Sequence, residues 1–219
     1  MNRLQIAQRV RQEAGISGSG PVTTIAQTGE MGKIVDWVDA AYQDIQNLYD
    51  WNFLRFDFSF PTIASSSTYT PTAAGFPELA KWKQDSMRIY LIPSDESIIY
   101  YQEWDYFRDS RLIGTIPTGR PSEFSTRPDK SIVLWQTPNA IFTVVGEYFK
   151  RAQTMTANAD EPNLPSQFHM AIVWKAVQYY AGDQGAAELY AIAHNEYTSI
   201  LRKLKKDQLP LISMAGSLV

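Results

Sequence analysis

The chain has 219 residues, of which 44% are apolar, 20% charged and 13% aromatic. This length and composition are typical of one or two folded domains with a substantial core. A net charge of −3 excludes a global basic surface for gripping nucleic acid, and the absence of cysteine excludes disulfide bonds and thiolate metal sites. No stretch approaches the roughly 18 apolar residues of a membrane span, so we expect a soluble protein without membrane contacts.

The N-terminal region predicts two helices separated by a loop. Residues 2–14 favour a short amphipathic helix, which Gly15 ends, and the glycine- and serine-rich residues 15–21 indicate a flexible linker. A stronger helix is predicted for residues 30–50. The apolar positions that define these helices are Ile6, Val10 and Ala14 in the first and Ile34, Val38, Ala41, Ile45 and Leu48 in the second.

The middle of the chain predicts strands. Apolar and polar residues alternate over residues 54–60, which is the pattern of a half-buried strand. Residues 79–83 indicate a short turn, and residues 103–111 one or two helical turns. Further strands are predicted at residues 87–92, 97–101, 121–125, 131–136 and 141–149. About six short strands are enough for a small barrel or sandwich.

The helical period returns toward the C-terminus. A helix is predicted to open at Pro165, where Asp160 and Glu161 would supply the negative charge favoured at a helix N-terminus. Gly182 interrupts the pattern, and a final long helix ends in the cationic residues 202–206.

This order of elements predicts an α+β fold. We expect a helical bundle built from residues 1–50 and 151–206, with a β-rich insertion, a small barrel or sandwich, at residues 51–150. Residues 207–219 lose helical periodicity and are expected to form an extended C-terminal arm.

The sequence offers few residues for catalysis or metal binding. Its two histidines, His169 and His194, lack a second ligand at metal-binding spacing, so both are interpreted as packed or surface side chains. The carboxylates suited to acid–base hydrolysis are Glu103 with Asp105 and Glu123 with Asp129, on irregular segments. We therefore expect no cofactor, no metal and no catalytic site. A virion-associated peptidoglycan hydrolase built on those carboxylates is the alternative hypothesis.

The two ends of the C-terminal region leave alternatives open. Residues 202–206 are interpreted as a helix end whose cations suit the helix dipole, and any DNA contact there would be local and non-specific. Residues 209–219 are too apolar for a typical solvated terminus. They either dock on their own domain or order on a neighbouring protein, by strand addition or by filling a groove.

Several motifs resemble those of the head–tail adaptor proteins of tailed bacteriophages, the group related to the tail accessory factors of short-tailed phages. The likeness covers nearly the whole chain. Its motifs are residues 49–53 (Tyr-Asp-Trp-Asn-Phe), 121–124 (Pro-Ser-Glu-Phe), 132–135 (Ile-Val-Leu-Trp), 138–140 (Pro-Asn-Ala), 147–151 (Glu-Tyr-Phe-Lys-Arg) and 160–165 (Asp-Glu-Pro-Asn-Leu-Pro).

The resemblance implies a structural protein of the virion neck, made in the host cytoplasm. It implies a homo-oligomeric ring, commonly a dodecamer, under the portal protein, with tail nozzle or tail fibre proteins on the other side and DNA passing through. Another neck or nozzle ring component is a further alternative. The residues expected to form a portal-interaction arm are Lys203, Lys205, Lys206, Leu209, Leu211, Ile212, Met214 and Leu218.

Overall fold

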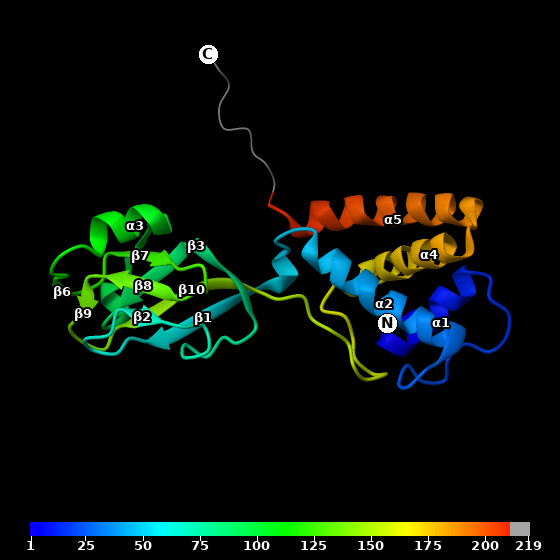
Figure 1. Ribbon diagram of the computed structural model, residues 1–219, viewed down its shortest axis with the longest axis horizontal. Helices are drawn as coiled ribbons and strands as arrows, with labels where there is room; N and C mark the ends of the chain where they lie inside the picture. Colours follow the sequence, from blue (N-terminus) through cyan, green and yellow to red (C-terminus); the bar gives the residue numbers. More distant parts are fainter. Residues whose placement is uncertain (211–219) are drawn as a thin grey trace, which may run out of the picture. The chain divides into compact units, whose positions relative to one another are not determined.

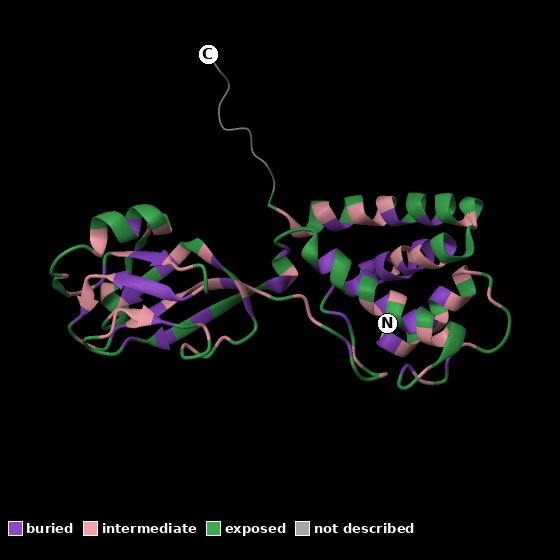
Figure 2. Ribbon diagram, viewed as in Figure 1, coloured by how far each residue is buried: buried purple, intermediate pink, exposed green. Residues whose placement is uncertain are grey.

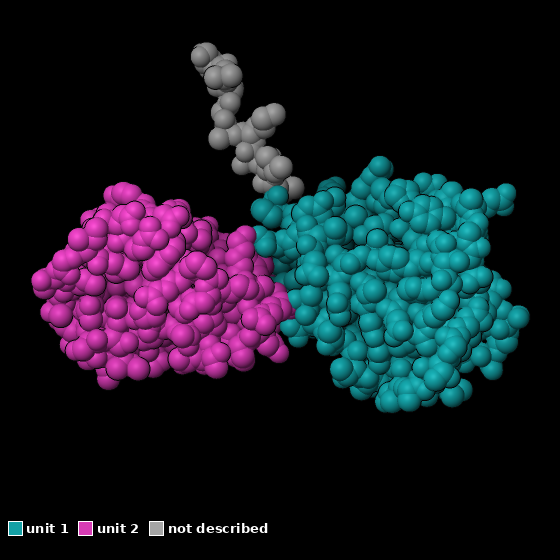
Figure 3. All heavy atoms as spheres, viewed as in Figure 1, with its two compact units in different colours: residues 1–54, 152–219 teal, residues 55–151 magenta. Residues whose placement is uncertain are grey.

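A computed structural model describes residues 1–210 of the protein. These residues form two compact units (Figure 3). The helical unit contains Met1–Leu54 together with the described residues from Ala152 onward, and the β unit contains Arg55–Arg151. The α+β class predicted from the sequence, with a β-rich insertion between N- and C-terminal helices, is confirmed (Figure 1).

The helical unit is arranged around one central helix. The helices of the described residues are α1 (Arg3–Glu13), α2 (Gly29–Asn47), α3 (Trp104–Arg111), α4 (Met170–Gln184) and α5 (Ala187–Gln208), with short 3-10 turns η1 (Asn52–Leu54), η2 (Pro93–Asp95) and η3 (Ser166–Phe168). All but α3 and η2 belong to this unit, and α4 packs against α1, α2 and α5. Consecutive residues of α4 are buried, such as Ile172 with Val173 and Ala176 with Val177, because the helix has neighbours on several sides.

Two details of this unit differ from the sequence prediction. The second helix ends at Asn47, so Leu48 caps it and remains 45% exposed instead of joining the apolar stripe. Asp160 does not start a helix. Its carboxylate accepts hydrogen bonds from the backbone N–H groups of Thr156 (2.7 Å) and Ala157 (2.8 Å), and α4 begins only at Met170. These bonds hold the pKa of Asp160 below its usual range.

The β unit consists of two facing four-stranded sheets and a small two-stranded one. Sheet A has the order β1-β10-β3-β4, sheet B the order β2-β8-β7-β5, and β6 pairs with β9 (Figure 1). The strands are β1 (Arg55–Pro61), β2 (Thr68–Tyr69), β3 (Leu79–Tyr90), β4 (Ser97–Ile98), β5 (Tyr100–Tyr101), β6 (Thr118–Gly119), β7 (Glu123–Thr126), β8 (Ile132–Trp135), β9 (Thr137–Pro138) and β10 (Thr143–Lys150).

An aromatic-rich core lies between the two sheets. Sheet A contributes Phe58, Phe60 and Trp82, and sheet B contributes Phe124 and Leu134. Figure 2 shows these buried segments inside the β unit, with the exposed residues outside. Such aromatic packing accounts for the high aromatic content of the sequence. The β unit is therefore a small sandwich, one of the two architectures predicted.

The strand β3 is longer than the sequence indicated, because residues 79–83 are its first half and not a turn. The pairing of β10 with β3 shifts register between Val145 and Glu147, which is a β-bulge. At the bulge, Gly146 lies under the ring of Phe58, where a Cβ atom would come within 2.9 Å of two ring carbons. A glycine is needed here because only it allows this close approach.

Candidate functional site

The end of α5 carries the described part of the predicted portal-interaction arm. Leu204 is fully buried, whereas Lys203 and Lys206 on the same turns are exposed. Lys203 and Lys206, three positions apart, share an exposed side of the helix. Lys205 is half-buried, and its ammonium lies 4.5 Å from the centre of the Tyr49 ring. This places three cations at the C-terminal end of the helix, where the dipole favours positive charge.

The chain leaves the helix directly after these lysines. Leu209 is extended, and its backbone N–H donates to the carbonyl of Lys205 at 3.0 Å. The helix itself reaches Gln208, so the first two residues of the predicted arm are helical. The structure thus brings Lys203, Lys205, Lys206 and Leu209 together on one helix end. The other predicted arm residues, Leu211, Ile212, Met214 and Leu218, lie outside the described residues.

A polar cluster between α2, α4 and α5 positions this helix. The Tyr179 hydroxyl donates to the Asp44 carboxylate, and the Lys175 ammonium lies 3.6 Å from the same carboxylate. The lysine also lies 4.8 Å and 5.7 Å from the ring centres of Tyr179 and Tyr197. Burial, and then the hydrogen bond to Asp44, raise the pKa of Tyr179. Burial and nearby negative charge raise the pKa of Tyr197 to about 12. Both tyrosines are neutral near pH 7, and Tyr197 connects α5 to the cluster through the Lys175 ammonium.

Sequence reasoning missed this cluster. Lys175 and Tyr179 are four positions apart on α4, which is a recognisable helical pair. Their partner Asp44 lies on another helix far away in the sequence, and no local spacing indicates that contact.

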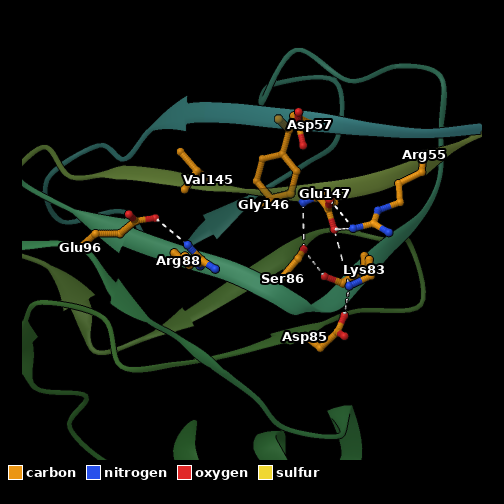
Figure 4. Close-up of a pocket in the computed structure, with 11 residues that line it drawn as sticks. Arg55, Asp57, Lys83, Asp85, Ser86, Arg88, Glu96, Val145, Gly146 and Glu147 are labelled. Atoms are coloured by element: carbon orange, nitrogen blue, oxygen red, sulfur yellow. Dashed lines mark hydrogen bonds and ion pairs between the residues drawn. The ribbon is translucent and has the colours of Figure 1, made fainter. Parts of the chain in front are cut away.

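The outer face of sheet A contains a polar groove of about 550 Å³ (Figure 4). The Arg55 guanidinium lies 2.5 Å from the Glu147 carboxylate, and Lys83 lies 3.5 Å from Glu147 and 2.9 Å from Asp85. On the other side of the groove, Arg88 pairs with Glu96 at 3.5 Å. Opposite charges alternate across neighbouring strands, which stabilises the exposed face of the sheet.

Two polar side chains of the groove, Asp85 and Ser86, have structural partners. A catalytic carboxylic acid needs a raised pKa, whereas the hydrogen bond from Lys83 lowers the pKa of Asp85. The Ser86 hydroxyl donates to the carbonyl of Lys83 and accepts from the backbone N–H of Glu147, so it supports the β-bulge. The arrangement is therefore a structural ion-pair network.

The carboxylates considered for the hydrolase alternative have structural partners. Glu103 caps α3 by accepting hydrogen bonds from the backbone N–H groups of Asp105 and Tyr106. Glu123 receives two hydrogen bonds of 2.8 Å from the Arg111 guanidinium. Asp129 accepts from the backbone N–H of Ser131, which lowers its pKa. Glu103, Glu123 and Asp129 are thus each held by backbone N–H groups or by an arginine.

The histidines have different surroundings. His169 is buried, and its Nε2 lies 2.9 Å from the carbonyl of Leu164, to which it donates. His194 is exposed and stacks on Tyr190 with ring centres 6.2 Å apart. Within residues 1–210, no three His, Asp or Glu side chains are grouped so as to hold a metal ion. None of the helices in this part of the chain has the length and apolar character needed to cross a membrane.

Comparison with known proteins gives one family. A family model described as SU10 adaptor protein matches residues 1–214, which include both units. A search of curated proteins finds no match to the chain.

Proposed function

Because the chain belongs to the SU10 adaptor protein family and is thus a phage adaptor protein, we propose that it forms a ring under the portal. In this position it joins the capsid to the tail and lets the DNA pass. The observation that carries the proposal is the family match over nearly the whole chain, since it includes the helical bundle, the inserted sandwich and the cationic end of α5.

The surface of α5 supports an assembly role. Of its 22 residues only Ala193, Tyr197 and Leu204 are buried, and Figure 2 shows the outward side of the helix as exposed along most of its length. Tyr190 and Ile192 are 46% and 56% exposed on this helix. Aromatic and aliphatic side chains that remain exposed on a long helix are available to another protein.

The cationic end of α5 is proposed as the portal contact. Lys203 and Lys206 project from one side of the last two turns, and Leu209 follows at the point where the chain becomes extended. Two exposed ammonium groups favour a partner surface that carries carboxylates, and such a contact weakens as salt screens it. The net charge of −3 suits a channel through which DNA slides without being held.

Sedimentation with and without the purified portal protein tests this function. We expect a monomer alone and a ring on the portal. The double variant Lys203→Glu, Lys206→Glu should remain monomeric and bind the portal less tightly, most clearly at low salt. The matched control Arg9→Glu, Lys33→Glu reverses two exposed cations on α1 and α2 and should bind like the parent protein. A compact dimer that ignores the portal would contradict the proposal.

The hydrolase alternative has less support, because Glu103, Glu123 and Asp129 have structural partners and the family is one of adaptors.

A further inference from the structure

The strand β1 is an edge strand of sheet A. It pairs with β10 in unbroken register over all seven residues, and no strand in the described part of the chain pairs with its other side. The end strands of the sheets other than β1 are only two residues long: β4, β2 and β5. Proteins usually shorten, bulge or cover their edges, because free backbone N–H and C=O groups attract another strand. A long, regular edge such as β1 is therefore suited to receive one.

The side chains of β1 show what an added strand would meet. Arg55, Asp57 and Ser59 are exposed on the polar outer face, and the first two line the groove of Figure 4. On the opposite face Phe58 and Phe60 are buried, while Phe56 stays 38% exposed. A complementary strand needs small polar residues on one side and apolar residues on the other.

Residues 211–219 have this pattern in the sequence Leu-Ile-Ser-Met-Ala-Gly-Ser-Leu-Val. Within it, residues 212–218 alternate: Ile212, Met214 and Leu218 fall on one side of a two-residue period together with Gly216, and the small residues Ser213, Ala215 and Ser217 fall on the other, with Leu211 and Val219 at the two ends of that side. The segment has no charge and no proline, and its nine residues are enough to pair along the seven of β1. Pro210, which cannot continue a helix, precedes it.

We propose that residues 211–219 of one copy add as a strand to β1 of the neighbouring copy. The serine side of the segment then lies beside Ser59 and Asp57, and its apolar side lies beside Phe56. This inference rests on the proposed ring and names the contact that joins its copies. It assigns the apolar tail to a second copy instead of the portal, and leaves Lys203 and Lys206 for the portal.

A contact of this kind can build a ring. The tail and β1 are different segments of the chain, so the contact is heterologous, and repeating it from copy to copy forms a ring when the rotation between copies closes. In this contact, backbone hydrogen bonds would join the added strand to β1. The alternation of side chains would determine which side of the added strand faces the apolar side of the sheet.

The absence of native cysteine allows a direct crosslinking test. One preparation carries Ser59→Cys, and a second carries Ser213→Cys or Ser217→Cys. The two are mixed in equal amounts, assembled on the portal, and joined by oxidation or by a short bis-maleimide linker. The same mixtures are treated as concentrated free protein, so the strand contact is tested whether or not the portal recruits the chain.

We expect a crosslinked dimer between the two preparations with at least one tail position. In the control, Ser110→Cys replaces Ser59→Cys. Ser110 is an exposed serine of α3, which packs on β7 of the other sheet, so its dimer should be severalfold weaker. No dimer in either setting, or an equal dimer with the control, would overturn the proposal. A chain that carries both Ser59→Cys and Ser217→Cys and forms only an intramolecular crosslink would also overturn the proposal. Portal recruitment is scored separately by sedimentation, and its loss counts against the proposed function alone.

Discussion

Among single residues, Arg3 connects three segments that lie far apart in the chain. Its guanidinium, on α1, donates to both carboxylate oxygens of Asp39 on α2 at 3.1 Å and 2.5 Å, and to the Thr24 hydroxyl at 3.0 Å. It also donates to the carbonyl of Thr156 at 2.8 Å. Arg3 is only 8% exposed, so these donors need protein partners in place of water.

Replacing Arg3 should therefore destabilise the helical unit. For Arg3→Met we expect the free energy of unfolding to fall by about 2–3 kcal/mol, because Asp39 loses its partner and two further acceptors lose theirs. The loss is smaller than for a fully buried pair because the Asp39 side chain keeps 26% exposure. Urea unfolding followed by far-ultraviolet circular dichroism measures it.

Arg9→Met is the matched control on the same helix. Arg9 is 47% exposed and pairs only with Glu13, four residues away, so its replacement should cost about 0.5 kcal/mol or less. Equal losses of unfolding free energy in the two variants would show that the contacts of Arg3 with other segments do not stabilise the fold.

The role of Arg3 does not follow from the sequence. An arginine in the first turn of an amphipathic helix fits a solvated position as well as a buried one, and its partners are 21, 36 and 153 positions away. The lysines at residues 203, 205 and 206 are different, because a single helix places them together and periodicity alone indicates it.

At the level of elements, the spacing of apolar residues predicts those helices and strands that follow one regular period along their length. The helices α2 and α5 follow the three-four spacing of their apolar residues, and β1 follows strict alternation. The first half of β3 does not. Its buried residues Leu79 and Trp82, and Met87 after them, are spaced unevenly because the strand bulges along this stretch, and charged residues fill the outer face. A bulge interrupts the two-residue period, so the strand looks like a turn.

The start of α4 should be sensitive to acid. His169 precedes this helix, and burial, followed by the charge of the Met1 ammonium beside it, lowers its pKa. A histidine whose pKa is lower in the folded state stabilises the fold above its unfolded value of about 6.5, and this stability is lost as pH falls through the folded value. We expect the free energy of unfolding of the helical unit to fall between about pH 7 and pH 5.

The variant His169→Gln isolates this effect. A glutamine amide can still donate to the Leu164 carbonyl but does not titrate, so the decrease between these pH values should become smaller. Asp160, whose pKa is lowered, titrates below this range and does not obscure the result. An unchanged pH dependence in the variant would show that His169 is not the group responsible.

For the whole molecule, the order helices–strands–helices already predicts a helical unit interrupted by a β-rich one. The reason is that the change of period from about 3.6 to 2 and back is visible along the chain. The function is harder to predict from the sequence than the fold. The chain shows no catalytic pattern, so its role as a phage adaptor comes from the family and not from side-chain chemistry. The proposed contact with the portal depends on a partner that this sequence does not encode.

Electron micrographs of particles made with and without this protein test the central claim most directly. If the chain joins the capsid to the tail, particles lacking it should be DNA-filled heads without tails, and adding the purified protein should restore tail attachment. Particles that keep their tails in its absence would contradict the account.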